Sequence, residues 1–180
     1  CGLKFTKWRA VIQITPNRVS SFALEANAHA LARYAALSQE AGLVPIVEPE
    51  VIMDNDKDIE YNQLVTEDAL SSTFKALQDH KVDLSAMVLK PNMVLSGYKC
   101  EKQASLQEVA SRTAQSLFFA VNRDVPGIAF LSGGQSDELA TNRLAAISAE
   151  SDEFRCTFSF GRGLQATPLK IWKGSPANVS

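Results

Sequence analysis

The residue most suggestive of chemistry is a lysine that ends an apolar run. Lys90 closes the apolar part of "SAMVLKPNM", and Pro91 follows it directly. Apolar surroundings and a second cation, Lys7, would both favour the neutral amine, a nucleophile that can form a Schiff base with a ketone. A lone lysine at a strand end more often extends its ammonium group into solvent, so Lys90 does not decide the function by itself.

Two pairs of charged residues could assist such an amine. Glu48 and Glu50 lie two apart in "VEPE", on the same side of an extended strand. Carboxylates beside an amine suit the proton transfers of carbinolamine formation and dehydration. Lys7 and Arg9 lie two apart in "KWR" and suit an anionic group. Taken alone, the acidic pair would more often be a solvated strand–loop junction.

Two glycine-containing stretches could bind an anion. "LSGGQS" places the hydroxyl of Ser132 before Gly133 and Gly134, whose backbone N–H groups carry no Cβ beside them. "FGRG" places the guanidinium of Arg162 after Gly161. Either stretch alone is more often a plain turn, but together they resemble the phosphate site formed by the last two loops of a (β/α)₈ barrel.

Strand-like and helix-like segments alternate along the chain. Strands are expected over residues 8–14, 43–51, 84–90, 127–134 and 155–162. Helices are expected over residues 22–42, 66–80, 105–121 and 137–148, with a last helical stretch ending near "KIWKG". Five mostly apolar strands, each followed by a helix, predict an α/β fold with a parallel sheet covered by helices.

A barrel is favoured over a doubly wound sheet. No GxGxxG or GxxxxGK[ST] motif occurs. Lys7, Glu48, Lys90 and Ser132 follow one another at steps of 41, 42 and 42 residues, one βα unit each, and the last three are expected at strand C-terminal ends. Lys7, expected just before the first strand, fits this pattern less well.

We therefore predict residues 1–180 to be a single incomplete domain, a partial TIM (β/α)₈ barrel made of about its last five βα units. A whole barrel takes eight strands, so roughly the first three are expected to be missing. The first and fifth strands should then be open edges. Val47, Val88 and Phe130, expected on the inner face, should lack packing partners.

The composition excludes several classes of protein. The chain has 180 residues, of which 46% are hydrophobic, and a net charge of −2, which predicts an ordinary globular domain with no nucleic-acid or membrane partner. Cys1, Cys100 and Cys156 lack ligand spacing, which favours a reducing compartment without disulfides. His29 and His80 fall in or at the end of helices, so no metal site is expected.

The segments "KWR", "GLVPIVEPEV", "VLKPNMV", "VPGIAFLSGGQS" and "TFSFGRGLQ" together resemble class I fructose-bisphosphate aldolase, over residues 5–174. The resemblance implies a metal-independent lyase of glycolysis and gluconeogenesis that needs no cofactor. Such an enzyme reversibly cleaves fructose 1,6-bisphosphate to dihydroxyacetone phosphate and glyceraldehyde 3-phosphate. It also implies phosphorylated sugars as partners, a homotetramer in the full-length protein and a cytoplasmic location, with organelle targeting left open.

The resemblance also implies roles for individual residues. Lys90 would form the Schiff base, Glu48 would be the main acid and base, and Glu50 would tune the lysine and the substrate hydroxyls. Lys7 would polarise the reacting carbon, and Arg9 would bind the far phosphate. The near phosphate and the dihydroxyacetone part would be held by Ser132, Gly133, Gly134, Ser159, Gly161 and Arg162.

Several departures from the family pattern leave an alternative open. Phe160 stands where tyrosine is common, Gly163 where alanine is common, and "MDNDKD" replaces the usual loop after Glu50. The family's cleavage aspartate, a further active-site lysine and a C-terminal tyrosine belong to segments that this sequence does not contain. The alternative is a truncated, inactive aldolase-like polypeptide with a binding or vestigial role. A transaldolase-like enzyme is a nearer alternative, but two anion sites fit a bisphosphate better.

Overall fold

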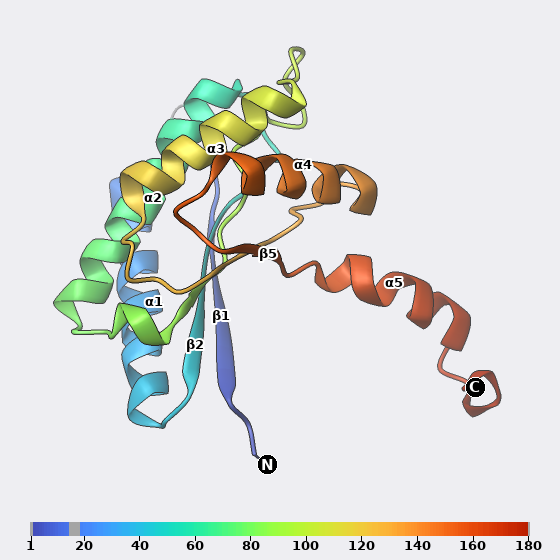
Figure 1. Ribbon diagram of the computed structural model, residues 1–180, viewed down its shortest axis with the longest axis horizontal. Helices are drawn as coiled ribbons and strands as arrows, with labels where there is room; N and C mark the ends of the chain where they lie inside the picture. The colour runs from blue at the N-terminus through green and yellow to red at the C-terminus, as the bar shows by residue number, and fades with distance from the viewer. Residues whose placement is uncertain (1, 15–18, 180) are drawn as a thin grey trace.

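The computed structural model describes residues 2–14 and 19–179, so Cys1 lies outside the described part. Within these described ranges, five strands alternate with five α-helices (Figure 1). The strands are β1 (Phe5–Ile12), β2 (Val44–Val51), β3 (Val88–Leu89), β4 (Ile128–Phe130) and β5 (Cys156–Phe158). The α-helices are α1 (Ser21–Glu40), α2 (Ile59–Asp79), α3 (Leu106–Ala120), α4 (Asp137–Glu150) and α5 (Gly161–Trp172), with 3₁₀ turns η1 (Leu84–Ala86) and η2 (Pro176–Asn178).

The strands form one sheet in the order β1-β2-β3-β4-β5, and every neighbouring pair is parallel. Among the described residues the sheet does not close into a barrel, so β1 and β5 are its edges. Helices α1 to α4 pack beside one another and against the strands, while α5 projects away from them (Figure 1). The predicted alternation and parallel sheet are confirmed, and so are the two open edges.

The main core lies between the sheet and these helices. Val47, Leu89 and Phe130 are fully buried there with helix residues such as Leu77 and Leu117. The prediction that Val47 and Phe130 would lack packing partners is therefore wrong. Side chains of a strand alternate between the two faces, so the face that carries Glu48 cannot also carry its neighbour Val47. Val88, the third residue of that prediction, is partly buried.

Several element boundaries differ from the prediction. β1 starts at Phe5, so Lys7 lies inside the strand instead of preceding it. α2 starts at Ile59, well before residue 66, because the Asp58 side chain caps it by accepting from the Tyr61 N–H at 2.8 Å. β3 is reduced to two residues, since a 3₁₀ turn occupies Leu84–Ala86.

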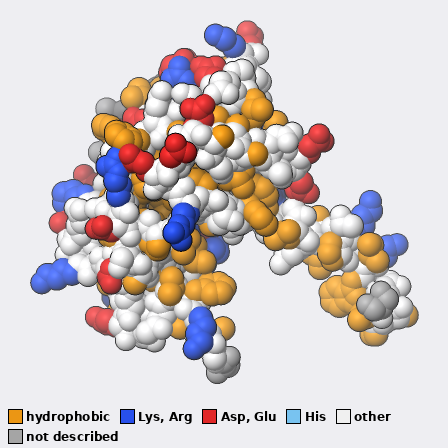
Figure 2. Space-filling model, in the orientation of Figure 1, with side chains coloured by type: hydrophobic (Ala, Val, Ile, Leu, Met, Phe, Trp, Pro, Cys, Tyr) orange, Lys and Arg blue, Asp and Glu red, His pale blue; other side chains and the backbone are white. Residues whose placement is uncertain are grey.

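The C-terminal elements also differ. β4 ends at Phe130 and β5 at Phe158, so Ser132 lies in the turn after β4. Gly161 and Arg162 begin α5 and do not end the fifth strand as predicted. No residue of α5 is buried. Its exposed apolar side chains lie next to an apolar surface on the part of the molecule from which α5 projects (Figure 2). Among the described residues, no helix combines the length and apolarity needed to cross a bilayer.

Candidate active site

Five of the predicted site residues meet on β1, β2 and the residue just after β3. The parallel pairing of β1 with β2 places Arg9 opposite Glu48. It places Lys7, two residues earlier, opposite Ile46. Period-two alternation puts Lys7, Arg9, Glu48 and Glu50 on the face that the helices leave uncovered. The sheet therefore brings side chains 41 residues apart in sequence into direct contact.

Glu48 is shared by two lysines. Its Oε2 accepts a hydrogen bond from Lys7 Nζ at 2.8 Å, and its Oε1 lies 3.2 Å from Lys90 Nζ. The side chains of Glu48 and Lys90 are only 4% and 11% exposed, whereas that of Lys7 is 43% exposed. A carboxylate in this position can exchange a proton with the Lys90 nitrogen or with a group bonded to it.

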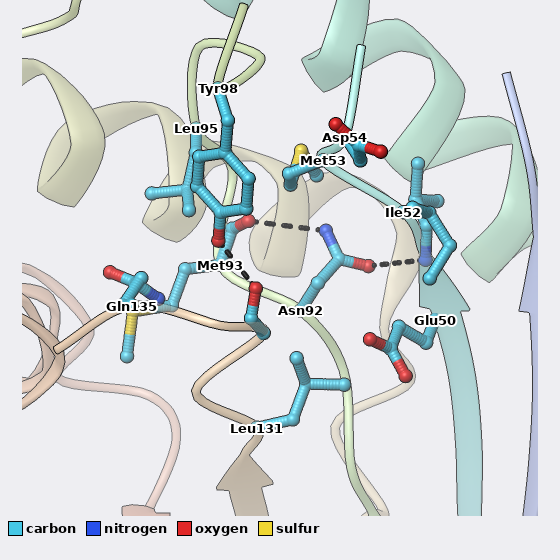
Figure 3. Close-up of a pocket in the computed structure, with 12 residues that line it drawn as sticks. Glu50, Ile52, Met53, Asp54, Asn92, Met93, Leu95, Tyr98, Leu131 and Gln135 are labelled. Carbon is cyan, nitrogen blue, oxygen red and sulfur yellow. Dashed lines mark hydrogen bonds between the residues drawn. The ribbon is translucent and has the colours of Figure 1, made fainter. Parts of the chain in front are cut away.

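Glu50 forms a second ion pair, with Arg9. The guanidinium Nε of Arg9 donates to Glu50 Oε2, and this bond raises the pKa of Arg9 above its ordinary value, although burial acts in the opposite sense. Glu50 is itself nearly buried. It lines a cavity of about 90 Å³ whose opposite wall includes Leu131 and Tyr98 (Figure 3).

Pro91 ends the series of backbone hydrogen bonds to β2, and the side chain of Asn92 makes the next hydrogen bond to that strand. Lys90 N–H donates to the Val47 carbonyl at 2.8 Å, whereas Pro91 has no N–H to donate. The next residue, Asn92, is buried, and its Oδ1 accepts from the Val51 N–H at 3.0 Å (Figure 3). Its Nδ2 donates to Thr66 Oγ1 at 3.1 Å and to the Met93 carbonyl at 3.2 Å. Asn92 therefore fixes the chain beyond Lys90 to β2.

The residues predicted to bind the near phosphate follow β4 and β5. Gly133 and Gly134 form a turn with φ of +59° and +89°. Ser159 N–H donates to the Phe130 carbonyl at 2.8 Å, which ties the end of β5 to β4. Gly161 and Arg162 are exposed in the first turn of α5, and within the described residues Arg162 forms no salt bridge.

The predicted residues thus fall into two sets. Lys7, Arg9, Glu48, Glu50 and Lys90 are joined by hydrogen bonds and ion pairs. The second set follows the adjacent strands β4 and β5, and no hydrogen bond or ion pair among the described residues joins it to the first, although Glu50 and Gly133 line the same cavity. The second set consists of Ser132, Gly133, Gly134, Ser159, Gly161 and Arg162.

The sequence did not indicate two residues that contact this second set, or a third that holds one of them. Tyr98 Oη donates to the Gly133 carbonyl (Figure 3), and Gln135 Nε2 donates to the Ser132 carbonyl at 2.8 Å. Arg143 Nη1 donates in turn to Gln135 Oε1 at 2.7 Å. The glutamine directly after a Gly-Gly pair was the only available signal.

Metal-ligating residues do not assemble in the part of the chain that the structure describes. His29 on α1 and His80 at the end of α2 place their ring centroids 4.9 Å apart. No group of three or more histidine, cysteine, aspartate or glutamate side chains among the described residues is arranged to hold a metal ion. Cys156 is partly buried, which raises its pKa to about 11.

Comparison with known proteins gives the family. The family model described as "Fructose-bisphosphate aldolase class-I" matches residues 1–180. Fructose-bisphosphate aldolase B of Homo sapiens is 50% identical over 179 residues, which are 98% of this chain and 49% of that protein. A probable class 1 fructose-bisphosphate aldolase of Xanthomonas campestris is 52% identical over 172 residues, covering 95% of this chain and 52% of that protein.

A solved structure agrees with these relatives. Fructose-bisphosphate aldolase of Plasmodium falciparum, in complex with TRAP and a small-molecule inhibitor, superposes with a TM-score of 0.92 at 42% identity. The match covers 97% of this chain and 51% of that one, so the chain spans about half the length of the relatives it matches. This chain belongs to the class I fructose-bisphosphate aldolase family.

Proposed function

We propose that this chain takes part in the reversible cleavage of fructose 1,6-bisphosphate to dihydroxyacetone phosphate and glyceraldehyde 3-phosphate through a Schiff base on Lys90. The observation that carries the proposal is the buried Glu48 carboxylate held between Lys90 and Lys7. A nucleophile with a general acid and base within reach is the minimum arrangement for this chemistry. The names of the relatives supply the substrate.

In the proposed reaction, the Lys90 amine attacks the C2 carbonyl of the ketose and forms a carbinolamine. Glu48 takes up the proton that Lys90 loses on becoming a free amine and transfers it to the C2 oxygen, which leaves as water and generates an iminium. The iminium accepts the electrons of the C3–C4 bond as that bond breaks and becomes an enamine. Protonation of the enamine at C3 and hydrolysis at C2 then release dihydroxyacetone phosphate and restore Lys90. The C4 hydroxyl proton passes to a base, which the family resemblance assigns to an aspartate outside this sequence. The positive charge of Lys7 stabilises negative charge that develops during the reaction, and its ion pair with Glu48 holds that carboxylate in place.

The two ends of the substrate would lie on opposite sides of Lys90. We assign the far phosphate to Arg9, which Glu50 orients. The near phosphate would contact the N–H groups after β4 and the side chain of Arg162 at the N-terminus of α5, where backbone dipoles favour an anion. Ser132 and Ser159 would contribute hydroxyls, and Gly161 would allow close approach of the backbone.

Further features of the whole protein are proposed from the family alone. They are a single (β/α)₈ barrel domain to which residues 1–180 contribute, a homotetrameric assembly and a cytoplasmic location. Analytical ultracentrifugation and imaging of a tagged gene product would test the last two.

Borohydride trapping tests the central step. The protein is incubated with dihydroxyacetone phosphate, reduced with sodium borohydride and digested, and the modified lysine is identified by mass spectrometry. We expect modification of Lys90, its loss in Lys90→Met and its persistence in Lys99→Met, which alters a surface lysine paired with Asp54. Modification of another lysine in the wild-type protein, or of none, would contradict the proposal.

A non-catalytic binding role is the second candidate. It is favoured by the two open sheet edges, where Phe5 and Trp8 on β1 and Phe158 on β5 are at least half exposed. The Plasmodium falciparum relative was solved in complex with TRAP. A chain with this role would bind partners without forming an iminium, so the trapping experiment separates the two candidates.

A further inference from the structure

The turn after β4 has the conformation of a type I′ turn. Gln135 N–H donates to the Ser132 carbonyl at 3.1 Å, which closes a four-residue turn over residues 132–135. Its two central residues, Gly133 and Gly134, both have positive φ, at +59° and +89°. Positive φ at both central positions is the type I′ pattern, whereas type II′ has positive φ only at the first.

The two turn types differ in the orientation of the central peptide. In a planar trans peptide the carbonyl and the N–H point in opposite directions. The Gly133 carbonyl therefore fixes where the Gly134 N–H points, and a flip of that one peptide would reverse both. Two glycines in sequence offer little steric resistance to such a flip, because neither carries a Cβ.

Tyr98 is the residue that fixes this peptide. Its Oη donates to the Gly133 carbonyl, and among the described residues no other group donates to that oxygen. The Tyr98 ring also lies within 3.8 Å of where a Cβ of Gly134 would be. In the same part of the chain, the N–H groups of Gly133 and Gly134 donate to no protein acceptor, so both are available to a ligand.

Tyr98 is itself held firmly. Its N–H donates to the Met53 carbonyl at 2.8 Å, and the N–H of Lys99 donates to the Asn55 carbonyl at 2.9 Å. These bonds join the loop after β3 to the loop after β2. Gly97 packs so closely on Asn55 that a Cβ would lie 2.3 Å from its oxygen atoms. The Tyr98 hydroxyl therefore reaches the turn from a braced backbone.

The other side of the turn is braced as well. Gln135 Nε2 donates to the Ser132 carbonyl, and the buried Arg143 holds Gln135 through a 2.7 Å bond. Nε of Arg143 has no hydrogen-bond partner among the described residues. The turn is therefore backed by a largely buried positive charge, which also favours an anion at its N–H groups.

We propose that Tyr98 is a positioning residue for phosphate binding. By holding the Gly133 carbonyl it keeps the Gly134 N–H directed at the ligand, so the loop after β3 controls anion binding at the turn after β4. This inference rests on the proposed function, which places the near phosphate at this turn. Burial raises the pKa of Tyr98, so its hydroxyl keeps its proton and remains a donor throughout the neutral range.

Tyr98→Phe tests the proposal in the protein as expressed from its gene. The change removes one oxygen from a side chain that is 42% exposed, so we expect the fold to persist. Dissociation constants are measured calorimetrically for inorganic phosphate, dihydroxyacetone phosphate and unphosphorylated dihydroxyacetone. We expect a loss of about 3- to 10-fold for both phosphate ligands, the range that one hydrogen bond supplies, and no change for dihydroxyacetone.

Tyr34→Phe is the matched control. The Tyr34 hydroxyl is hydrogen-bonded to Thr6 Oγ1 at 2.7 Å, on the β1 edge of the sheet, so its removal should leave the affinity for all three ligands unchanged. Unchanged phosphate affinity in Tyr98→Phe would overturn the proposal, as would an equal loss for all three ligands, which indicates general distortion. If the wild type is trapped at Lys90 while Tyr98→Phe binds phosphate normally, only this inference fails. If the wild type binds no phosphate and forms no iminium, the proposed function fails with it.

Discussion

Replacing Glu48 by glutamine should destabilise the protein more than removing either of its lysine partners. The substitution keeps the shape of the side chain but removes the charge that neutralises two ammonium groups. Lys90 is only 11% exposed and would be left as a buried cation without a counterion. Removing one partner of a buried ion pair typically costs about 3–5 kcal/mol, which is our expectation for Glu48→Gln.

The two lysines should respond differently. Lys7 is 43% exposed, so solvent screens its pairing with Glu48, and Lys7→Met should cost about 0–1 kcal/mol. Lys90→Met removes the buried cation and leaves Glu48 paired with Lys7, so it should cost less than Glu48→Gln. The three variants differ in charge at one cluster and little in volume, which makes them controls for one another.

Urea denaturation of the wild type and the three variants provides the measurement. Midpoints and slopes give the free energy of unfolding, provided that the slopes agree within error. The expected order of destabilisation is Glu48→Gln first, then Lys90→Met, then Lys7→Met. A cost below about 1 kcal/mol for Glu48→Gln, or an equal cost for Lys7→Met, would show that the carboxylate does not stabilise a buried cation as described.

Other changes test separate parts of the molecule. Arg162→Ala should weaken binding of dihydroxyacetone phosphate by about 1–2 kcal/mol, a modest value for an exposed guanidinium, and equal weakening for unphosphorylated dihydroxyacetone would refute the assignment. Gly97→Ala should cost about 2–3 kcal/mol, because a Cβ would lie 2.3 Å from Asn55 oxygens, while Gly127→Ala, with its nearest atom at 3.8 Å, should cost little; similar unfolding midpoints would contradict this. The pKa of Cys156 is raised from 9.0 to about 11, so the native thiol keeps a proton that the unfolded chain loses, and stability should fall as the pH rises from 9 to 11; rapid alkylation of Cys156 by iodoacetamide at pH 8 would exclude that burial effect. The 180-residue chain produced alone should self-associate through its two open sheet edges and turn over no fructose bisphosphate. A monodisperse, cooperatively melting and active monomer would refute this expectation.

The sequence predicted the order and type of the elements well, for physical reasons. Apolar runs such as "LVPIVEPEV" and helical periodicity mark segments whose burial dominates their conformation. Their ends were less predictable. The 3₁₀ turn at Leu84–Ala86 shortens β3, and capping by Asp58 starts α2 early; both depend on local hydrogen bonds that periodicity does not record.

The candidate site, too, was predictable from the sequence only in part. The steps of 41 and 42 residues placed Lys7, Glu48 and Lys90 on neighbouring strands, and the structure shows them in contact. The sequence could not show that the Glu48 carboxylate pairs with both lysines, because this depends on the rotamers of the three side chains. Tyr98 was missed because its bond to Gly133 spans 35 residues between two loops, where no periodic pattern exists.

The strand order has a consequence for the time course of folding during synthesis. Strands that are neighbours in the sheet are also neighbours in the chain, so each strand from β2 to β5 meets a partner that has already been made. At about 5–20 residues per second, roughly 2–8 s separate the synthesis of Glu48 from that of Lys90. Glu48 emerges from the ribosome ahead of Lys90 by the same interval and can pair with Lys7 within it, so the carboxylate has a cation before its second lysine emerges. Lys90 is the only one of the three that must be buried against an ion pair already formed.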